Sequence, residues 1–246
     1  MVPFEDIRRG FALFLADPHW LAKVLLAGVL LVNPFLLATA PAFFSHSENP
    51  FIIAVFWVSL GFNILSFSLP LGFTYEVLRR ARFGTAALLP GWKRQDLGRF
   101  AHEGSVMFLI ALFTLILPAG IWMALCHLLY ISILGLPRCL VPLFLFPAML
   151  LAVPFCGVAC CRWLDGTPAM DCALNYAENF RLFRKAWKSY LIASFFLIGF
   201  SAVTASFFYT LPFAAVFGLC LVDIWFGPVY AASREDENPD PARFRK

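Results

Sequence analysis

The sequence is poor in charged residues. Asp, Glu, Lys and Arg make up 14% of its 246 residues, whereas soluble domains carry about 25%. Hydrophobic residues make up 61%, and 29 of the residues are Phe. This composition excludes an ordinary soluble domain and indicates that many apolar side chains face lipid.

The sequence also lacks the patterns that mark common active sites. It has no Ser/His/Asp order, no glycine loop of the phosphate-binding kind and no paired catalytic carboxylates. We therefore expect no enzymatic activity and no cofactor.

The cysteines lack the spacing of a metal site. Cys156, Cys160 and Cys161 crowd one predicted helix end, but their spacing is not that of a zinc module, and cysteine in an apolar helix usually packs as a small hydrophobe. We therefore expect no metal. Cys126 and Cys139 both fall toward the predicted outer face, where an oxidising compartment would allow a disulfide between them.

What the chain has in abundance is long apolar runs. Crossing a hydrocarbon core of about 30 Å takes roughly 20 helical residues, and six runs reach that length. We predict an all-α membrane domain over residues 20–231 and a polar cytoplasmic tail over 232–246. The six predicted transmembrane helices cover residues 20–43, 51–75, 105–129, 139–161, 189–208 and 211–230.

The basic residues indicate the orientation. All but one of the 19 Lys and Arg, the exception being Arg138, fall at the termini or in the second and fourth loops. Because basic residues in short loops stay on the cytoplasmic side, both termini are predicted to be cytoplasmic, in a multi-pass protein of the cell membrane.

The spans are predicted to form three hairpins, each preceded by a cytoplasmic, interfacial amphipathic segment. The first segment is residues 1–19, which contain acids, lack a signal-peptide cleavage site and have Phe4, Ile7 and Phe11 at helical spacing. The third is predicted to be one helix that follows Thr167, with its apolar stripe running from Met170 to Trp187.

Short motifs in the first half of the chain resemble the polytopic membrane proteins of domain-of-unknown-function family 4013. The best-matching segment is LPGWKRQDLGRFAHEG, residues 89–104. That family has no established activity to carry across, and here Lys93 and Arg94 stand where its acidic residues are expected. The resemblance rests on these residues: Asp17, Pro18, Trp20, Lys23, Gly28, Gly72, Glu76, Arg79, Arg80, Leu89, Pro90, Trp92, Leu97, Phe100 and Gly104.

Three polar residues fall at membrane depth. Asp223 is an acid well inside a predicted span, where such a group is a functional hypothesis by default; the alternative is a purely structural hydrogen bond to Asn63, a hydroxyl or a kinked backbone. Asn63 and Asn33 are interpreted as polar contacts that hold helices together, with a substrate role as the alternative.

The basic second loop is predicted to meet anionic lipid headgroups, with a solvated loop that only sets topology as the alternative. The candidate headgroup-binding residues are Arg79, Arg80, Arg82, Lys93, Arg94 and Arg99. The retention of basic loops on the cytoplasmic side accounts for the positive charge of this loop, so we expect no nucleic-acid partner.

Together these patterns favour a non-enzymatic membrane protein that serves as an accessory subunit or scaffold of a membrane assembly, with a membrane-protein partner or a second copy of itself. The alternative is a carrier or permease for a lipid or a small apolar solute. It is suggested by Asp223 and by proline-broken spans, among them those with Pro118 and Pro147.

Overall fold

The computed structural model describes residues 5–44, 49–85, 87–129, 141–205 and 210–235, and over these residues the chain is helical without strands. The α-helices are α1 (Glu5–Leu15), α2 (Trp20–Leu31), α3 (Pro34–Phe44), α4 (Pro50–Ser66), α5 (Ser68–Arg82), α6 (Leu97–Ala111), α7 (Leu117–Cys126), α8 (Val141–Leu164), α9 (Ala169–Leu174), α10 (Tyr176–Lys185), α11 (Trp187–Ala205) and α12 (Leu211–Glu235). A 3-10 turn, η1 (Arg94–Asp96), precedes α6, and a π-helical segment, η2 (Leu112–Ile116), joins α6 to α7.

The expected all-α class is confirmed, and five helical stretches in the described part are long and apolar enough to cross a membrane. These are Trp20–Phe44, Pro50–Arg82, Arg94–Leu129, Phe146–Leu164 and Pro212–Arg234. The remaining predicted span, 189–208, falls on α11, whose apolar stretch Trp187–Gly199 is shorter than a full crossing within the described residues.

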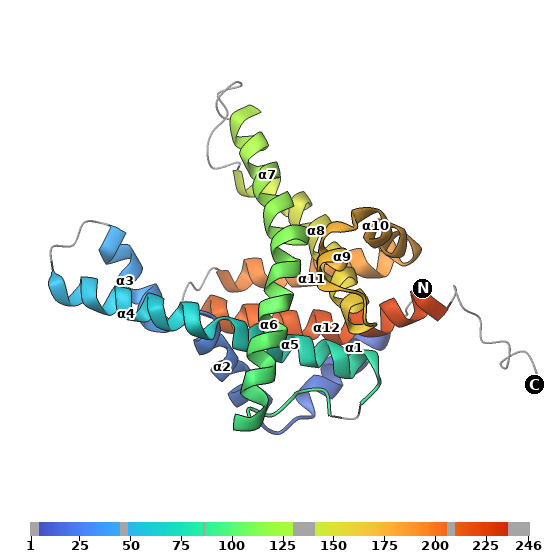
Figure 1. Cartoon of the computed structure of the whole chain (residues 1–246), viewed down its shortest axis with the longest axis horizontal. Helices are drawn as coiled ribbons and strands as arrows, with labels where there is room; N and C mark the ends of the chain where they lie inside the picture. Colours follow the sequence, from blue (N-terminus) through green and yellow to red (C-terminus); the bar gives the residue numbers. More distant parts are fainter. Residues whose placement is uncertain (1–4, 45–48, 86, 130–140, 206–209, 236–246) are drawn as a thin grey trace, which may run out of the picture.

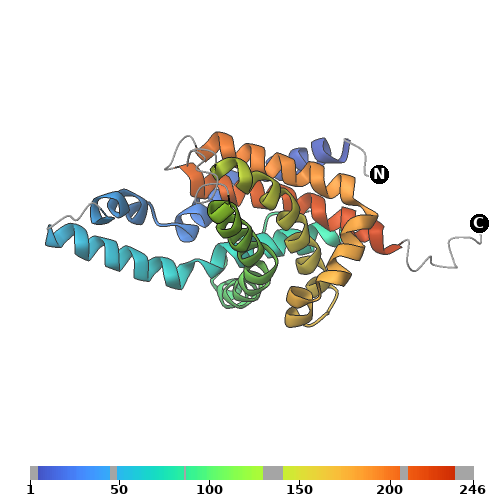
Figure 2. The ribbon, with the colours of Figure 1, turned by 90° about the horizontal axis from the view of Figure 1, so that it is seen from above.

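The helices form a bundle with one long crossing rod (Figure 1). In Figures 1 and 2, α5, α11 and α12 run side by side, and the rod made of α6, η2 and α7 crosses α5 steeply. Helix α8 packs on this rod and on α11, and the hairpin of α3 and α4 extends away from the bundle.

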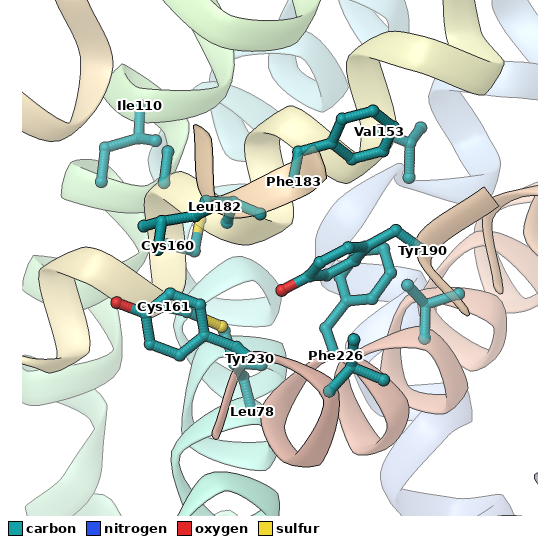
Figure 3. Packing of buried hydrophobic residues seen from close by; sticks show 14 of the residues in the cluster. Leu78, Ile110, Val153, Cys160, Cys161, Leu182, Phe183, Tyr190, Phe226 and Tyr230 are labelled. Atoms are coloured by element: carbon teal, nitrogen blue, oxygen red, sulfur yellow. The ribbon is translucent and has the colours of Figure 1, made fainter. Parts of the chain in front are cut away.

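The main core lies where α8, α10, α11 and α12 meet α5 and α6 (Figure 3). Tyr190 of α11 and Phe226 of α12 are fully or almost fully buried, with ring centroids 5.2 Å apart. Phe226 also fills the space left by Gly157 of α8, where a β-carbon would overlap its ring. Aromatic burial of this kind sets how closely α8 and α12 approach.

Two predicted helices are interrupted. The first span breaks at Val32 and Asn33, just before Pro34, because proline cannot donate the backbone bond that would continue the helix. The third amphipathic segment, predicted as one helix, is instead two, and that prediction was wrong: Asn175 separates α9 from α10 and its side chain accepts the Glu178 N–H as the cap of α10.

The N-terminal helix α1 packs along α12. Phe14 is fully buried, and its ring lies edge-on to Phe217 with centroids 5.1 Å apart. A β-carbon on Gly10 would lie 3.1 Å from a methyl group of Ile224, so the two helices are also close there. The interfacial placement of residues 1–19 stays a prediction.

Candidate functional site

The polar centre of the molecule is built on a close crossing of two helix backbones. A β-carbon on Gly72 of α5 would overlap the carbonyl oxygen of Phe100 in α6, and one on Gly104 of α6 would overlap that of Ser68. Only glycine permits this approach, as small residues do at membrane helix interfaces generally. The crossing brings the last two turns of α5 against the start of α6.

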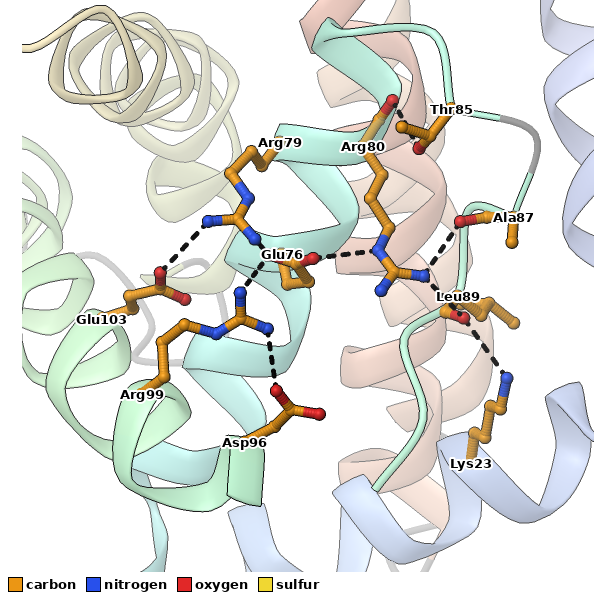
Figure 4. Close-up of polar contacts among 10 residues, drawn as sticks. All are labelled: Lys23, Glu76, Arg79, Arg80, Thr85, Ala87, Leu89, Asp96, Arg99 and Glu103. Carbon is orange, nitrogen blue, oxygen red and sulfur yellow. Dashed lines mark hydrogen bonds and ion pairs between the residues drawn. The ribbon is translucent and has the colours of Figure 1, made fainter. Parts of the chain in front are cut away.

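Glu76 lies one turn beyond this crossing and is almost completely buried (Figure 4). Its Oε2 is 2.5 Å from Arg79 Nη2 and 3.7 Å from Arg99 Nη1, and its Oε1 accepts a hydrogen bond from Arg80 Nε at 2.9 Å. A buried carboxylate requires such partners, because leaving it unpaired is costly.

The arginines are in turn bridged by two further acids. Arg79 Nη1 lies 3.6 Å from Glu103, and Arg99 Nη2 lies 3.4 Å from Asp96. We call Glu76, Arg79, Arg80, Asp96, Arg99 and Glu103 the Glu76 cluster. Its three acids and three arginines balance in formal charge.

The same cluster holds the loop between α5 and α6. Arg80 Nη1 donates to the carbonyl oxygens of Ala87 and Leu89, at 3.0 and 3.3 Å, and Lys23 Nζ of α2 donates to the Leu89 carbonyl at 3.3 Å (Figure 4). The Trp92 indole N–H donates to the Lys23 carbonyl at 3.2 Å, and its ring stacks on Phe73 at a centroid distance of 4.9 Å. Residues far apart in the sequence therefore meet around one loop.

Lys23 also pairs with Asp17, just before α2. Its Nζ donates to Asp17 Oδ2 at 2.6 Å, and the His19 backbone N–H donates to Oδ1 at 2.8 Å. Desolvation raises the pKa of the Asp17 carboxyl, but these hydrogen bonds outweigh it, so the pKa lies below its ordinary value.

A second polar cluster joins the ends of α5, α8 and α12. Asp165, just after α8, lies 3.7 Å from Arg82 Nη2 and 3.6 Å from Arg234 Nε. Arg162, buried in α8, donates to Asn179 at 2.7 Å and to Asp171 at 2.9 Å. These contacts fix α9 and α10 against the end of α8.

The headgroup candidates thus fall into two groups. Arg79, Arg80 and Arg99 belong to the Glu76 cluster, and Arg82 pairs with Asp165 while its guanidinium lies 5.7 Å from the centre of the Tyr230 ring. Lys93 and Arg94 are exposed. Among these six candidates, the side chains open to an outside partner are therefore mainly Lys93 and Arg94.

Asn63 and Asn33 meet at the break in the first span. Asn63 Nδ2 donates to the Leu31 carbonyl at 2.7 Å, and its Oδ1 accepts the Asn33 N–H at 2.5 Å. Nearby, Ser66 donates to the Leu30 carbonyl at 2.9 Å. These side chains satisfy backbone groups that the break leaves without helical partners.

Asp223 lies in α12 with 5% of its surface exposed, and its Oδ2 has no hydrogen-bond partner among the described residues. Asn63, one partner considered for it, is engaged at the α2–α3 break instead. Cys126 is buried near the end of α7, whereas Cys139 lies outside the described residues, and with it the predicted disulfide.

Sequence reasoning missed the Glu76 cluster as a unit. The spacing of Glu76 to Arg79 and Arg80, i to i+3 and i+4 on a helix, predicts the local pairs. Arg99 and Glu103 join only through the Gly72 and Gly104 crossing, which no local spacing reveals. Arg162 was likewise counted only among the basic residues of the fourth loop.

In both clusters, the charged side chains of the described residues pair with one another. In the described part of the chain, no three His, Cys, Asp or Glu residues come together as metal ligands would. The fold and the clusters define an all-helical protein with several helices long enough to cross a membrane. Comparisons with protein-family models, curated proteins and solved structures find no match for this chain.

Proposed function

We propose that this chain is a non-enzymatic, multi-pass protein of the cell membrane that serves as an accessory subunit or scaffold of a membrane assembly. The observation that carries the proposal is the α3–α4 hairpin, which extends from the bundle and packs mainly on itself (Figures 1 and 2). Because the arm makes few contacts with its own bundle, its surface is available to another membrane protein.

The hairpin is stiffened by its own aromatic contacts. Phe43 of α3 and Phe56 of α4 stack with centroids 4.0 Å apart, and Trp57 lies edge-on to both rings. Its outer side is apolar, with Val58 74% exposed and Phe62 45% exposed. A rigid apolar arm within the membrane suits contact with another membrane helix, through packing rather than charge.

In this proposal the cytoplasmic face carries the anionic-lipid contacts. Arg79, Arg80 and Arg99 are engaged inside the protein, so the contacts fall mainly to Lys93 and Arg94, each worth about 1 kcal/mol near an anionic surface. The assignment of the C-terminus to the cytoplasm is supported by Asp165, which joins the basic ends of α5 and α12. That of the N-terminus is supported by Lys23, which donates to the Leu89 carbonyl in the loop that follows α5.

Membership in domain-of-unknown-function family 4013 also stays a proposal. It is supported by the way in which residues that carry the resemblance gather around the α5–α6 loop. Lys23, Glu76, Arg80, Leu89 and Trp92 are linked there by direct hydrogen bonds or through shared partners.

The test is native mass spectrometry of protein extracted directly into polymer nanodiscs. We expect a complex with a stoichiometric protein partner or a homo-oligomer. Phe62→Ala on the hairpin should reduce the fraction of the protein found in that complex. The matched control is Phe195→Ala on α11. The side chain of Phe195 is 58% exposed, and its loss should leave the complex intact. A monomer for the wild type, or equal loss with both variants, would contradict the proposal.

A carrier for a lipid or small apolar solute is the second candidate, favoured by one specific observation. A groove of about 340 Å³ between the α6–α7 rod and α8 is lined by both Pro118 and Pro147 and by Trp122 and Tyr176. Asp223→Asn separates the two proposals: a carrier loses flux in reconstituted vesicles while its folding is unchanged, whereas a scaffold changes only in assembly or yield.

A further inference from the structure

A groove of about 490 Å³ runs along one side of α4 in the α3–α4 hairpin. The α4 residues that line it follow the spacing of a single helix face, and this face extends over about 16 Å, or about three turns. They are Phe51, Ala54, Val55, Val58, Ser59 and Phe62. Two of them, Phe51 and Val58, are each 74% exposed. The groove therefore has the length and outline of a second helix lying along α4.

The middle of this face is small, whereas its ends are bulky. Ala54, Val55 and Ser59 lie between the rings of Phe51 and Phe62. Small side chains on a membrane helix let a second backbone approach closely, and packing of this kind holds membrane helices together. A second helix therefore approaches α4 most closely beside Ser59.

Ser59 also brings a polar group to the groove. The residue is only 5% exposed, and its hydroxyl makes no hydrogen bond with the described residues. The unpaired hydroxyl of Ser194 is enclosed completely by the protein, whereas that of Ser59 keeps accessible surface, and Ser59 lines the groove. Asn33 lines it too, and its Nδ2 likewise donates to no described residue.

These polar groups select the occupant of the groove. The hydrocarbon of an acyl chain has no donor or acceptor, so lipid alone leaves the Ser59 hydroxyl unpaired. Two copies of one chain share their orientation in a bilayer, so the two-fold axis that relates them lies along the membrane normal, and identical residues meet at the same depth. Because a hydroxyl both donates and accepts, Ser59 is satisfied by its own counterpart.

We propose that α4 of one copy packs in parallel along α4 of a second copy, with the two Ser59 hydroxyls hydrogen-bonded across a two-fold axis. None of the residues that line the groove is charged, so two copies meet there without like-charge repulsion. This inference rests on the proposed function and names a second copy of the chain as the partner that the hairpin binds.

The first test counts the chains in each particle by native mass spectrometry, after extraction of the protein directly into polymer nanodiscs. We expect two copies of this chain. One copy together with a different protein would overturn this inference and leave the proposed function standing, whereas one copy alone would overturn both.

Substitutions at Ser59 test the place of the contact. Energy transfer between labelled copies in liposomes, measured over a range of protein-to-lipid ratios, gives the dissociation constant of the dimer. Ser59→Leu fills the groove where the helices approach and should abolish the dimer. Ser59→Ala should raise the dissociation constant about three-fold or more, the effect of one hydrogen bond between membrane helices.

Gly61→Leu on the same helix is the matched control. Gly61 does not line the groove, and a new β-carbon there has nothing within 4 Å, so the dissociation constant should not change. Unchanged dimerisation of a folded Ser59→Leu protein would overturn the proposal, as would an equal loss with Gly61→Leu.

Cross-linking keeps the test decisive even if Ser59→Leu does not fold. Ser59→Cys places a thiol beside the two-fold axis, so oxidation with copper phenanthroline should join two copies through a disulfide. Gly61→Cys, on a different side of α4, should be joined no more than the wild type with its native cysteines. Equal linking of the two variants, or none above the wild type with Ser59→Cys, would overturn the proposal.

Discussion

Gly72 and Gly104 are placed so that each lies against the backbone of the other's helix. A β-carbon on either would overlap a main-chain carbonyl, that of Phe100 or of Ser68. Because Glu76 follows Gly72 by one turn and Glu103 precedes Gly104, this contact between backbones also sets the distances within the Glu76 cluster. Packing and electrostatics at this end of the bundle therefore depend on the same two residues.

Gly104→Ala is expected to destabilise the protein by about 1–3 kcal/mol, the usual cost of overpacking, because the added methyl must push α5 and α6 apart. Gly98→Ala, in the same helix, is the control. Its β-carbon meets nothing within 4 Å, so the better helix propensity of alanine should stabilise the protein by up to about 1 kcal/mol. Denaturant titration followed by circular dichroism measures the free energy of unfolding of both variants. Similar changes for the two would contradict the close approach of the α5 and α6 backbones at Gly104.

Glu76→Gln should lower stability by about 1–3 kcal/mol. Removing one partner of a fully buried ion pair costs about 3–5 kcal/mol, but Arg79, Arg80 and Arg99 are 26–37% exposed, so water recovers part of the loss. The control is Glu178→Gln, which removes one partner of the more exposed pair with Arg181. It should lower the free energy of unfolding by only about 0–1 kcal/mol.

A double-mutant cycle makes the Glu76 prediction sharper. If Glu76 acts through Arg80, Arg80→Gln should cost clearly less in the Glu76→Gln background than in the wild type. Additive losses would mean that the two side chains stabilise the protein independently, despite the hydrogen bond between them at 2.9 Å.

The sequence was sufficient to predict features that depend on local composition. Apolar length predicted six spans, and five helical stretches of the described residues are long and apolar enough to cross a membrane. Proline-broken spans were also expected, and the first span breaks just before Pro34. The break within residues 169–185 was missed because the apolar stripe continues past Asn175, which fits the polar face of a single helix. The preference of Asn175 for capping outweighed that periodicity.

Features that depend on long-range contact could not be predicted in this way. Arg99 was counted as a free basic residue of a loop, yet the helix crossing turns it toward Glu76, and Arg82 is turned toward Asp165 by the meeting of α5 and α8. Single-sequence spacing says nothing about which helices touch, so the partners of these arginines depend on the tertiary structure.

The pairing of Asp17 with Lys23 should make stability depend on pH. The pKa of Asp17 is lower in the folded protein than in the unfolded chain, so the stabilisation is fully present above about pH 4 and is lost as the pH falls through the folded value. Asp17→Asn should therefore cost a constant amount from pH 7 to about pH 5 and progressively less below about pH 4.

Lys23→Met provides the control for this pH effect. It removes the hydrogen bond that lowers the pKa, so Asp17→Asn made in that background should change stability little and with a weaker pH dependence. An undiminished pH-dependent loss in the Lys23→Met background would assign the effect to the His19 N–H alone.

The π-helical segment η2 gives the last prediction. In this segment the Leu117 N–H donates to the carbonyl oxygen of Leu112, five residues earlier. By the same spacing, the Phe113 carbonyl would accept from the backbone N–H of residue 118. Pro118 has no backbone N–H, so that carbonyl lacks a helical donor. Tyr176 of α10 supplies the missing donor through its hydroxyl, at 2.6 Å, and so ties α10 to the middle of the crossing rod. Tyr176→Phe should cost about 1 kcal/mol, the worth of one hydrogen bond.

The cause of that loss can be isolated with Pro118→Ala. Alanine restores a backbone N–H beside the Phe113 carbonyl, so Tyr176→Phe should cost clearly less in the Pro118→Ala background than in the wild type. Equal costs in the two backgrounds would show that Tyr176 stabilises the protein through its ring rather than its hydroxyl. In that case, α10 would be held to the rod by apolar packing within the groove that Pro118 and Tyr176 line.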